Sequence, residues 1–305
     1  MPRIGRVEIP GELVAARIAH GGAAGRRFLA ELPGRAEYFL REWGLRPDGA
    51  AMAGVCALVL PVVRADGLPA VLKLQDPDEE TAGEPRALRA WRGDGAVLLL
   101  DHDAATGTML LERLDPARPL PGAGDSREAV LVLAGLLARL TARPAPEGLR
   151  QLDVIARELL ERAGRELPRV ADPVVRSLLV DCAAALREVA GECGDRLLHW
   201  DLHFGNVLAG RREPWLVIDP KPLAGDPGFE LLPALHNRYL PDEVRWRFEA
   251  MTGELGLDRA RARAWTLARV LEFCLWELAE TGELARPGEP AGAARVLDIA
   301  ARLRH

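Results

Sequence analysis

The residues with the clearest chemical potential lie in two neighbouring stretches, His199-Trp-Asp-Leu-His-Phe-Gly-Asn-Val-Leu208 and Trp215-Leu-Val-Ile-Asp-Pro-Lys221. Asp201 stands five residues before Asn206, and Asp219 follows thirteen residues later at the end of an apolar run. A carboxylate at Asp201 can accept a hydrogen bond from a hydroxyl group and orient it for in-line attack on a phosphoryl group. The Asn206 amide and the Asp219 carboxylate offer the hard oxygen ligands that magnesium prefers. The spacing therefore predicts the catalytic and metal-binding part of an ATP-dependent phosphotransferase.

Three further polar residues of these stretches have more than one interpretation. His199 is expected to hold the loop through a backbone hydrogen bond. His203 either lines the substrate pocket or helps to fix the loop. Lys221, two residues after Asp219, either contacts the transferred phosphate or the acceptor, or pairs with a nearby acid. We take His203 and Lys221 as candidate substrate-binding residues.

Lysine is almost absent from the chain, which has 40 basic residues but only two lysines, Lys73 and Lys221. A coding sequence rich in G and C would disfavour lysine, so a lysine that remains is a candidate for a role that arginine cannot fill. Lys73 ends a strand-like segment, and a helical segment that contains Glu84 follows. An ammonium group there can contact nucleotide phosphates while a carboxylate holds it. Glu84 is the first candidate for that carboxylate and Glu80 the second; the alternative is a solvated lysine on an edge strand.

Two apolar segments are candidates for further nucleotide contacts. The small residues from Gly49 to Gly54 would let backbone N–H groups approach phosphates, although an ordinary turn has the same composition. The segment Met109-Leu-Leu-Glu112-Arg-Leu114 ends a strand just before the helical half of the chain. It could offer backbone groups to adenine between apolar side chains, or it could be a core strand without a binding role. Gly54, Met109, Glu112 and Leu114 are therefore candidate nucleotide-binding residues.

The acceptor side of the site has candidates on later segments. Asp226-Pro227 has the composition of a helix N-cap with proline at the first position, and substrate contact is the alternative role for Asp226. Glu272, Trp276 and Glu280 fall at i, i+4 and i+8 beside an apolar helical stripe. Such a face could bind a cationic ligand by charge and by cation–π contact, or it could be a solvated helix face.

The elements that must position these residues divide the chain into two halves. The first half alternates strand-like and helical patterns, with Pro33-Gly34 as a possible break in its first helix. Its expected elements are a helix at 25–43, strands at 51–63 and 69–74, a helix within 76–91, and strands at 97–100 and 108–112. The pattern predicts a small α+β lobe with an antiparallel sheet.

The second half is expected to be mainly helical. Asp125-Ser-Arg-Glu128 resembles a capping box for a helix that ends near Arg143, and a local loop is expected at 287–290. Further helices are expected within 151–193 and 226–304, with loop and short strand at 199–221. We therefore predict a nucleotide-binding lobe at 1–113 and a helical lobe with the catalytic loop and substrate site at 114–305.

Composition narrows the class of protein. The net charge of −5 argues against binding to nucleic acid through a general basic surface, and it suits a cationic small-molecule substrate. The four cysteines form neither a CxxC pair nor a zinc-type spacing, as expected for reduced thiols. We find neither a signal peptide nor an apolar run of the roughly 20 residues that span a membrane. We expect a monomer in the cytoplasm.

The chain resembles the aminoglycoside phosphotransferase family, and within it the branch of streptomycin 6-phosphotransferases and hydroxyurea phosphotransferases. The resemblance covers most of the chain and is carried by Ala65-Asp-Gly67, Val71-Leu-Lys-Leu74, Leu88-Arg-Ala-Trp91, Leu99-Leu-Asp-His-Asp103, Met109-Leu-Leu-Glu-Arg-Leu114, His199-Trp-Asp-Leu-His203, Ile218-Asp-Pro-Lys-Pro222, Gly225-Asp-Pro227 and Trp265-Thr-Leu-Ala-Arg269. It implies a bilobal α+β fold like that of protein kinases, with ATP and Mg2+ as cofactors. It also implies that Asp201 is the catalytic base, that Asn206 and Asp219 bind the metal, and that Lys73 contacts the phosphates.

Two departures limit what the resemblance implies. Trp200 stands where much of the wider family has glycine, although the streptomycin branch resembles this chain there. The tripeptide Asp219-Pro-Lys221 replaces the DFG of protein kinases, and no segment like APE follows. A small-molecule acceptor is therefore expected rather than a protein.

The expected activity is transfer of phosphate from ATP to an aminoglycoside, at the 6-hydroxyl of streptomycin. One alternative is the same reaction on hydroxyurea or another small hydroxylated metabolite. A second alternative is a nucleotide-binding protein with little catalysis, which the intact set of Lys73, Asp201, Asn206 and Asp219 argues against. A serine hydrolase is disfavoured because neither Ser126 nor Ser177 stands in a nucleophile elbow.

Overall fold

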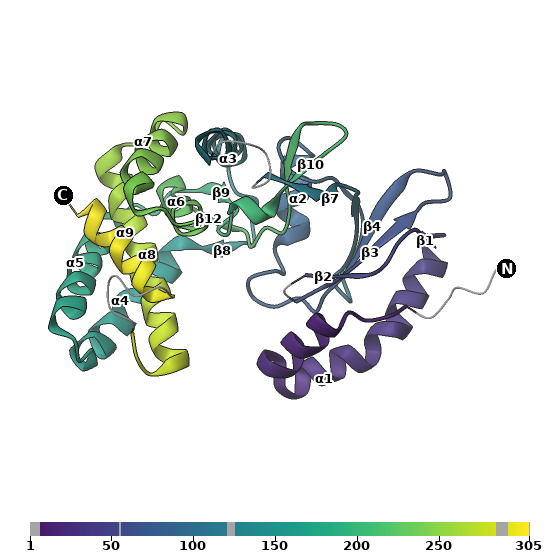
Figure 1. Ribbon diagram of the computed structural model, residues 1–305, viewed down its shortest axis with the longest axis horizontal. Coiled ribbons are helices and arrows are strands. Elements are labelled where there is room, and N and C mark those ends of the chain that lie inside the picture. The colour runs from purple at the N-terminus through teal and green to yellow at the C-terminus, as the bar shows by residue number, and fades with distance from the viewer. Residues whose placement is uncertain (1–6, 55, 121–125, 285–291, 305) are drawn as a thin grey trace. The chain divides into compact units, whose positions relative to one another are not determined.

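The computed structural model describes residues 7–54, 56–120, 126–284 and 292–304. The chain divides into two compact units, which are described one at a time (Figure 1). Unit 1 consists of Met1–Gly93 and Val97–Asp115, and unit 2 of Asp94–Ala96 and Pro116–His305. Strands β1 to β6 belong to unit 1. Of the helices in the described residues, α1 and α2 belong to unit 1 and the others to unit 2.

Unit 1 is built on an antiparallel sheet with the strand order β1-β3-β4-β6-β5, and β2 also pairs with β3. The strands are β1 (Arg46–Pro47), β2 (Met52–Ala53), β3 (Leu58–Val63), β4 (Pro69–Leu74), β5 (Leu99–Asp103) and β6 (Thr108–Glu112). The predicted bounds of β4 and β6 are confirmed. The segment predicted as one strand at 51–63 is two strands, because the Gly54 N–H donates to the Ala57 carbonyl and closes a turn between them.

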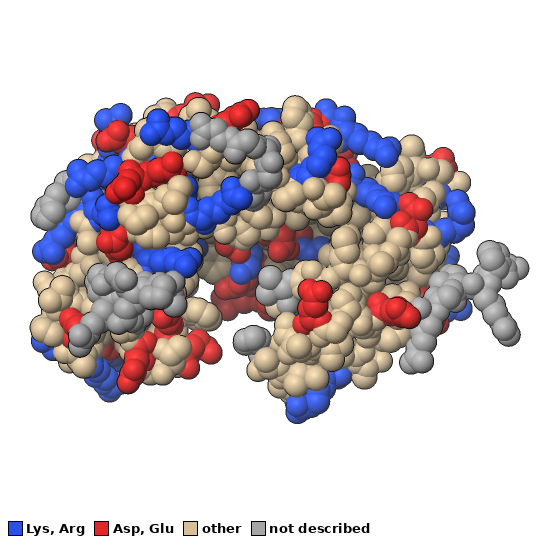
Figure 2. All heavy atoms as spheres, in the orientation of Figure 1, with Lys and Arg blue, Asp and Glu red and all other residues tan. Residues whose placement is uncertain are grey.

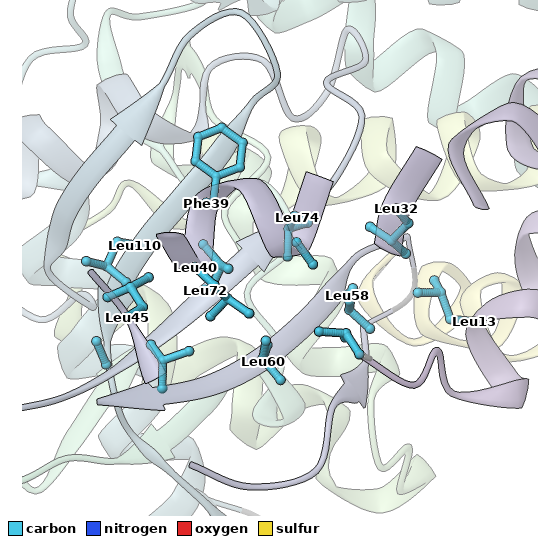
Figure 3. Close-up of a cluster of buried hydrophobic side chains, with 14 of the residues drawn as sticks. Leu13, Leu32, Phe39, Leu40, Leu45, Leu58, Leu60, Leu72, Leu74 and Leu110 are labelled. Carbon is cyan, nitrogen blue, oxygen red and sulfur yellow. The ribbon is translucent and has the colours of Figure 1, made fainter. Parts of the chain in front are cut away.

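Helix α1 (Gly11–Glu42) covers one face of this sheet (Figure 1). It begins earlier than predicted, with a kink at Gly22, and it continues through Pro33. The expectation of a break at Pro33 was wrong, because burial of the apolar side of the helix outweighs one lost backbone hydrogen bond. Figure 3 shows Leu32, Phe39 and Leu40 of α1 lying against Leu58, Leu60, Leu72 and Leu74 of the sheet.

The alternation of side chains along β4 sets up the other face of the sheet. Ala70, Leu72 and Leu74 belong to the core shared with α1. Successive residues of a strand point to opposite faces, so Val71 and Lys73 lie on the face away from α1. The strand pattern alone therefore places Lys73 opposite the main core of unit 1.

Helix α2 (Glu84–Trp91) lies within the segment 76–91 in which a helix was predicted. The Asp78 side chain accepts hydrogen bonds from the backbone N–H groups of Glu80 and Thr81, at 3.0 and 2.8 Å. This local turn competes with helix formation, so Glu80 precedes the helix. Glu84 is the first helical residue and Pro85 follows it, as its fixed φ favours at a helix start.

Unit 2 contains most of the helices and two small sheets. The sheets have the orders β11-β10-β7 and β8-β12-β9, and α5 and α8 pack side by side. The elements are β7 (Asp115–Pro119, its first residue in unit 1), α3 (Ser126–Thr141), β8 (Arg150–Gln151), α4 (Leu152–Glu166), η2 (Leu167–Arg169), α5 (Pro173–Val189), β9 (Arg196–Leu198), η3 (Phe204–Asn206), β10 (Val207–Ala209), β11 (Trp215–Val217), β12 (Leu223–Gly225), η4 (Pro227–Glu230), α6 (Leu231–His236), η5 (Pro241–Glu243), α7 (Val244–Glu254), α8 (Arg259–Thr281) and α9 (Ala293–Leu303). The predicted capping residue Asp125 and the predicted loop at 287–290 lie outside the described residues.

The surface carries both signs of charge. Figure 2 shows acidic and basic side chains interspersed on each unit over the face that it presents, in line with the small net charge of −5. Within the described part of the chain, no helix combines the length and apolar character that crossing a bilayer requires. All four cysteines lie within that part, and none of them forms a disulfide.

Candidate active site

The structure pairs Lys73 with Glu84 in unit 1. The Lys73 Nζ lies 2.8 Å from both carboxylate oxygens of Glu84. Lys73 is 5% exposed and Glu84 is fully buried, and the Gln75 amide donates to Glu84 Oε2 at 2.9 Å. Of the two acids considered from the sequence, the structure therefore selects Glu84 and leaves Glu80 in the turn before α2. An ammonium group is a compact positive charge of the kind that binds phosphate.

Apolar side chains surround Lys73 on its own face of the sheet. The register places Val59 of β3 and Met109 of β6 directly beside Lys73. Met109 is fully buried, whereas Val59 and Val71 remain partly exposed. A half-exposed apolar surface next to a cation can bind a flat base and the phosphates attached to it. Nucleotide contact by the buried Met109 stays a prediction.

The other predicted nucleotide-binding residues, Gly54, Glu112 and Leu114, are hydrogen-bonded or buried within unit 1. The Glu112 N–H donates to the Leu98 carbonyl at 2.9 Å, so this group is not offered to a base in this structure. The Glu112 side chain accepts from the Leu98 N–H at 3.2 Å, and Leu114 is buried. The Gly54 N–H closes its own turn onto Ala57 at 2.8 Å instead of facing a phosphate. Gly54 and Glu112 therefore form hydrogen bonds within unit 1, and nucleotide contact by Gly54, Glu112 and Leu114 stays a prediction.

In unit 2, His199 connects the two predicted catalytic stretches. Its Nδ1 accepts from the Asp201 N–H at 3.3 Å, so the proton is on Nε2, which donates to the Ile218 carbonyl at 3.0 Å. Complete burial lowers the pKa of His199 to about 4, so the ring is neutral at physiological pH. The predicted structural role of His199 is confirmed: it ties the loop of Asp201 to the residue before Asp219.

Asn206 and Asp219 stand at the same end of the β10–β11 ladder. Val207 pairs with Val217, and the Ile218 N–H donates to the Asn206 carbonyl at 2.9 Å. The Asn206 Nδ2 donates to the Asp201 carbonyl at 3.0 Å, which leaves the amide oxygen as the atom that can face a cation. An amide oxygen and a carboxylate fit Mg2+, which takes few protein ligands and completes its octahedron with phosphate and water.

Asp201 is paired with Lys221. The Lys221 Nζ lies 3.5 Å from Asp201 Oδ2, and each side chain is about one-third exposed, at 32% and 34%. Of the roles considered for Lys221, the structure shows the pairing with a nearby acid, and that acid is the proposed base itself. His203 accepts the Gly205 N–H at 3.0 Å through Nδ1, so it helps to fix the loop that follows Asp201.

Two residues of the site have left-handed backbone conformations. Trp200 has φ +70° and Asp219 has φ +59°, a region that residues other than glycine adopt at a cost of roughly 1–2 kcal/mol. Such strain persists only where surrounding contacts determine the conformation. Trp200 directly precedes Asp201, and Asp219 is itself a proposed metal ligand. The fold therefore stores strain next to the proposed base and at the proposed metal ligand.

Glu230 is a functional residue that reasoning from the sequence missed. Its Oε1 accepts the Trp200 N–H at 2.7 Å, one residue before Asp201. Glu230 is fully buried, and its Oε2 has no hydrogen-bond partner within the described residues. Burial raises the pKa of Glu230 to about 7. The signal in the sequence was an acid inside the apolar run Phe229-Glu-Leu-Leu232.

The buried Glu230 carboxyl predicts a pH effect on stability. Its pKa rises from 4.5 when unfolded to about 7 when folded, so the native state holds this proton more tightly. The stability that the protonated Glu230 adds to the folded state is fully present below pH 4.5 and is lost as the pH rises through 7. We expect the free energy of unfolding of wild type minus that of Glu230→Gln to fall by about 3 kcal/mol over this range. Urea unfolding of both proteins at several pH values measures the difference.

His199 acts in the opposite direction and therefore serves as an internal check. Its pKa is lowered to about 4, so its contribution is present above pH 6.5 and is lost as the pH falls. In Glu230→Gln, stability should rise between pH 4 and 6.5, because burial lowers the pKa of His199 and also those of His102 and His236. A difference between the two proteins that does not change with pH would contradict the assignment of a proton to Glu230.

The candidate acceptor residues differ in their surroundings. Asp226 caps η4 by accepting the Gly228 N–H at 2.8 Å, and its other oxygen accepts from Arg261 Nε at 2.6 Å, so we assign it to the support of the site. Glu272 forms an ion pair with Arg269. Trp276 is 56% exposed on the same helix, and the Phe273 ring lies 6.1 Å from it. Of these three, Trp276 is the residue most accessible to a ligand.

Comparisons with known proteins agree with this geometry. The model of a family described as aminoglycoside/hydroxyurea antibiotic resistance kinase matches residues 42–281. The hydroxyurea phosphotransferase of Kitasatospora aureofaciens is 63% identical over 298 residues, covering 97% of this chain and 87% of the relative. The streptomycin 6-kinase of Streptomyces glaucescens is 52% identical over 287 residues, covering 92% and 93%.

A likeness to a solved structure supports the fold. The macrolide 2'-phosphotransferase of Brachybacterium faecium has a TM-score of 0.56 and 20% identity, over 90% of this chain and 98% of that one. With the antiparallel sheet of unit 1 and the helices of unit 2, this confirms the predicted α+β fold like that of protein kinases. On the match of its family model and of its relatives, the chain belongs to the aminoglycoside/hydroxyurea antibiotic resistance kinase family.

Proposed function

We propose that this kinase transfers the γ-phosphoryl group of ATP to the 6-hydroxyl of streptomycin. The observation that carries the proposal is the joining of Asp201, Asn206 and Asp219 into one structure by His199 and by the β10–β11 ladder. The relative named streptomycin 6-kinase supports the acceptor. The product would bind the ribosome less well, which would give resistance or self-protection.

In the proposed reaction, Asp201 accepts the hydrogen bond of the acceptor hydroxyl and aligns its oxygen with the γ-phosphorus. The new oxygen–phosphorus bond forms as the bond to the β–γ bridging oxygen breaks, ADP leaves, and the hydroxyl proton passes to Asp201. Asn206 and Asp219 would hold magnesium, which when bound neutralises phosphate charge. Lys73 contacts the phosphates, and the apolar face around Val59 and Val71 receives the base. Unit 1 is thus the nucleotide-binding part, and unit 2 provides the catalytic and acceptor groups.

Hydroxyurea is the second candidate acceptor, because the hydroxyurea phosphotransferase relative is 63% identical. The candidate acceptor residues on helix α8 favour streptomycin over hydroxyurea. Its exposed Trp276 and nearby acids suit the cationic guanidinium groups of streptomycin, whereas hydroxyurea is small and neutral. An aromatic and acidic face would contribute little to the binding of hydroxyurea.

The acceptor can be identified by separate coupled assays with Mg-ATP and streptomycin, hydroxyurea or kanamycin. We expect ADP release with streptomycin, and a phosphate on the 6-hydroxyl by NMR of the product. Trp276→Ala should raise the KM for streptomycin by about tenfold, the loss of one cation–π contact, and should leave the KM for ATP unchanged. Turnover of hydroxyurea alone would replace streptomycin with the second candidate.

The same proposal places the protein in the cytoplasm, where ATP is available and where four cysteines without disulfides remain reduced. We propose that it acts as a monomer. Sedimentation at assay concentration should give the mass of one chain, 33.2 kDa.

A further inference from the structure

The indole of Trp200 gathers three cations beside the proposed base. The Arg150 guanidinium lies 4.3 Å from the ring centroid and that of Arg269 lies 4.8 Å away. The Lys221 Nζ lies 5.6 Å from the same centroid. Cations are attracted to the negative face of an indole, and tryptophan is the side chain that attracts them best. Position 200 has a backbone conformation that favours glycine, yet it is occupied by tryptophan, the side chain that binds cations most strongly through its ring.

Each of these cations also holds part of the catalytic structure. Arg269 donates to the Trp200 carbonyl at 3.2 Å, and Arg150 donates to the Lys221 carbonyl at 3.2 Å. Lys221 reaches the Asp201 carboxylate at 3.5 Å. The ring thus connects the loop before Asp201 with the segment after Asp219.

The backbone of Trp200 is fixed independently of its ring. The Glu230 carboxyl accepts its N–H, and Arg269 donates to its carbonyl. These two hydrogen bonds hold the left-handed conformation that a non-glycine residue would otherwise avoid. The backbone hydrogen bonds therefore set the direction in which the Trp200 side chain leaves the chain, and the Arg150 and Arg269 guanidinium groups pack against its ring. A ring held in this way can restrict a flexible neighbour.

Lys221 is the neighbour that needs this restriction. A lysine side chain has four rotatable bonds, and this one is 32% exposed, where an ion pair at 3.5 Å restricts the side chain only weakly. The indole face and the Arg150 bond to the Lys221 backbone limit where the ammonium group can lie. An ammonium beside Asp201 is well placed to stabilise negative charge on the phosphoryl group as it moves to the acceptor oxygen.

We propose that Lys221 is a catalytic residue that contacts the transferred phosphoryl group, and that Trp200 is the positioning residue that sets its ammonium against Asp201. This rests on the proposed phosphotransfer and assigns two roles within the same site. Because the lysine acts as charge moves, its loss affects kcat more than the KM for either substrate. The face of the Trp200 ring, rather than its bulk, is what Lys221 requires.

Steady-state kinetics of matched variants test the proposal. We expect Lys221→Met to lower kcat about 100-fold, the effect of removing one charge-stabilising donor. Trp200→Leu, which keeps an apolar side chain without a π face, should lower kcat about tenfold, and Trp200→Phe should restore most of it. The KM values for ATP and for the acceptor should stay within about twofold.

A double-mutant cycle decides whether Trp200 acts through Lys221. In Trp200→Leu with Lys221→Met, kcat should be no lower than in Lys221→Met alone, because the ring then has no lysine to place. Effects that multiply would overturn the proposal, and so would Leu and Phe variants that are equally slow. Trp246→Leu is the matched control, because Arg127 lies 5.0 Å from that ring in the same unit and neither residue is assigned to the reaction, so its kcat should not change.

The scarcity of lysine allows a test that needs no substrate. The chain has two lysines, so selective labelling of lysine gives two sets of side-chain NMR signals, and Lys221→Met assigns them. The Lys221 ε-methylene should be shifted upfield by the indole, should keep part of the shift in Trp200→Phe, and should lose it in Trp200→Leu and in Trp200→Gly, which relieves the left-handed strain. An unshifted signal in wild type would overturn the placement. If the shift is present and no acceptor is turned over, the placement stands and the proposed function fails.

Discussion

Asp201→Asn is expected to lower kcat by about 10²–10⁴-fold, while the KM for ATP stays within about twofold. Asparagine has nearly the same size, and it can keep the backbone bonds of residue 201 to His199 and Asn206. It cannot take the proton of the acceptor hydroxyl, and it no longer attracts the Lys221 ammonium at 3.5 Å. The change therefore removes two contributions to the reaction and leaves the fold intact.

The measurement is a coupled ADP-release assay over a range of both substrate concentrations. Asp195→Asn provides the control, because this aspartate is 88% exposed in the same unit and lies 4.0 Å from Arg196, outside the site. It should retain the wild-type kcat. If Asp201→Asn turned over acceptor as fast as wild type, another group would have to orient the hydroxyl.

The catalytic stretch could be predicted from the sequence because its geometry is local. Asn206 is five positions after Asp201, and one short turn brings the Asn206 amide back to the Asp201 carbonyl. The β10–β11 hairpin then returns the chain to Asp219 by pairing Val207 with Val217. Contacts of this kind depend on spacing and on strand alternation, which a single sequence displays.

The supports of the site could not be predicted in the same way. Glu230 is 30 residues from Trp200, and Arg269 is 69 residues from it. Their contacts form only when η4 and α8 pack near the loop, and arginine is so common in this chain that Arg150 and Arg269 carried no signal. The apolar surroundings of Glu230 were the one available indication.

The acid that pairs with Lys73 in unit 1 could not be chosen from the sequence either. The sequence offered Glu80 and Glu84 as partners of Lys73, because acids are favoured throughout the first turns of a helix. The Asp78 side chain binds the Glu80 and Thr81 N–H groups, so the helix starts at Glu84 instead. The turn at Asp78 competes with the helix for a few hydrogen bonds, and its formation leaves Glu84 rather than Glu80 as the buried acid.

Lys73→Met is expected to destabilise the protein by about 3–5 kcal/mol, because it leaves the fully buried Glu84 carboxylate without its cation. Methionine has a similar length and suits the apolar face, so loss of packing adds little. Adding Glu84→Gln should recover most of this stability, since the neutral amide can keep the bond with Gln75 without a buried charge. If Lys73 only stabilised the fold, the double variant would also regain activity.

We expect stability and activity to separate in this double variant. The KM for ATP should remain raised and kcat/KM lowered by about 10²–10³-fold, because the ammonium that contacts the phosphates is absent. Urea unfolding and ADP-release kinetics on wild type, Lys73→Met, Glu84→Gln and the double variant give both quantities. Lys73→Arg adds a charge-conserving test. A guanidinium can still bind both Glu84 oxygens with its planar fork, but it is larger than the ammonium that lies 2.8 Å from both of them, so its charge lies elsewhere and kcat/KM for ATP should fall although the charge is kept. Wild-type kinetics in Lys73→Arg would mean that a positive charge alone is sufficient at this position, and that the retention of lysine in a chain rich in arginine has no catalytic cause.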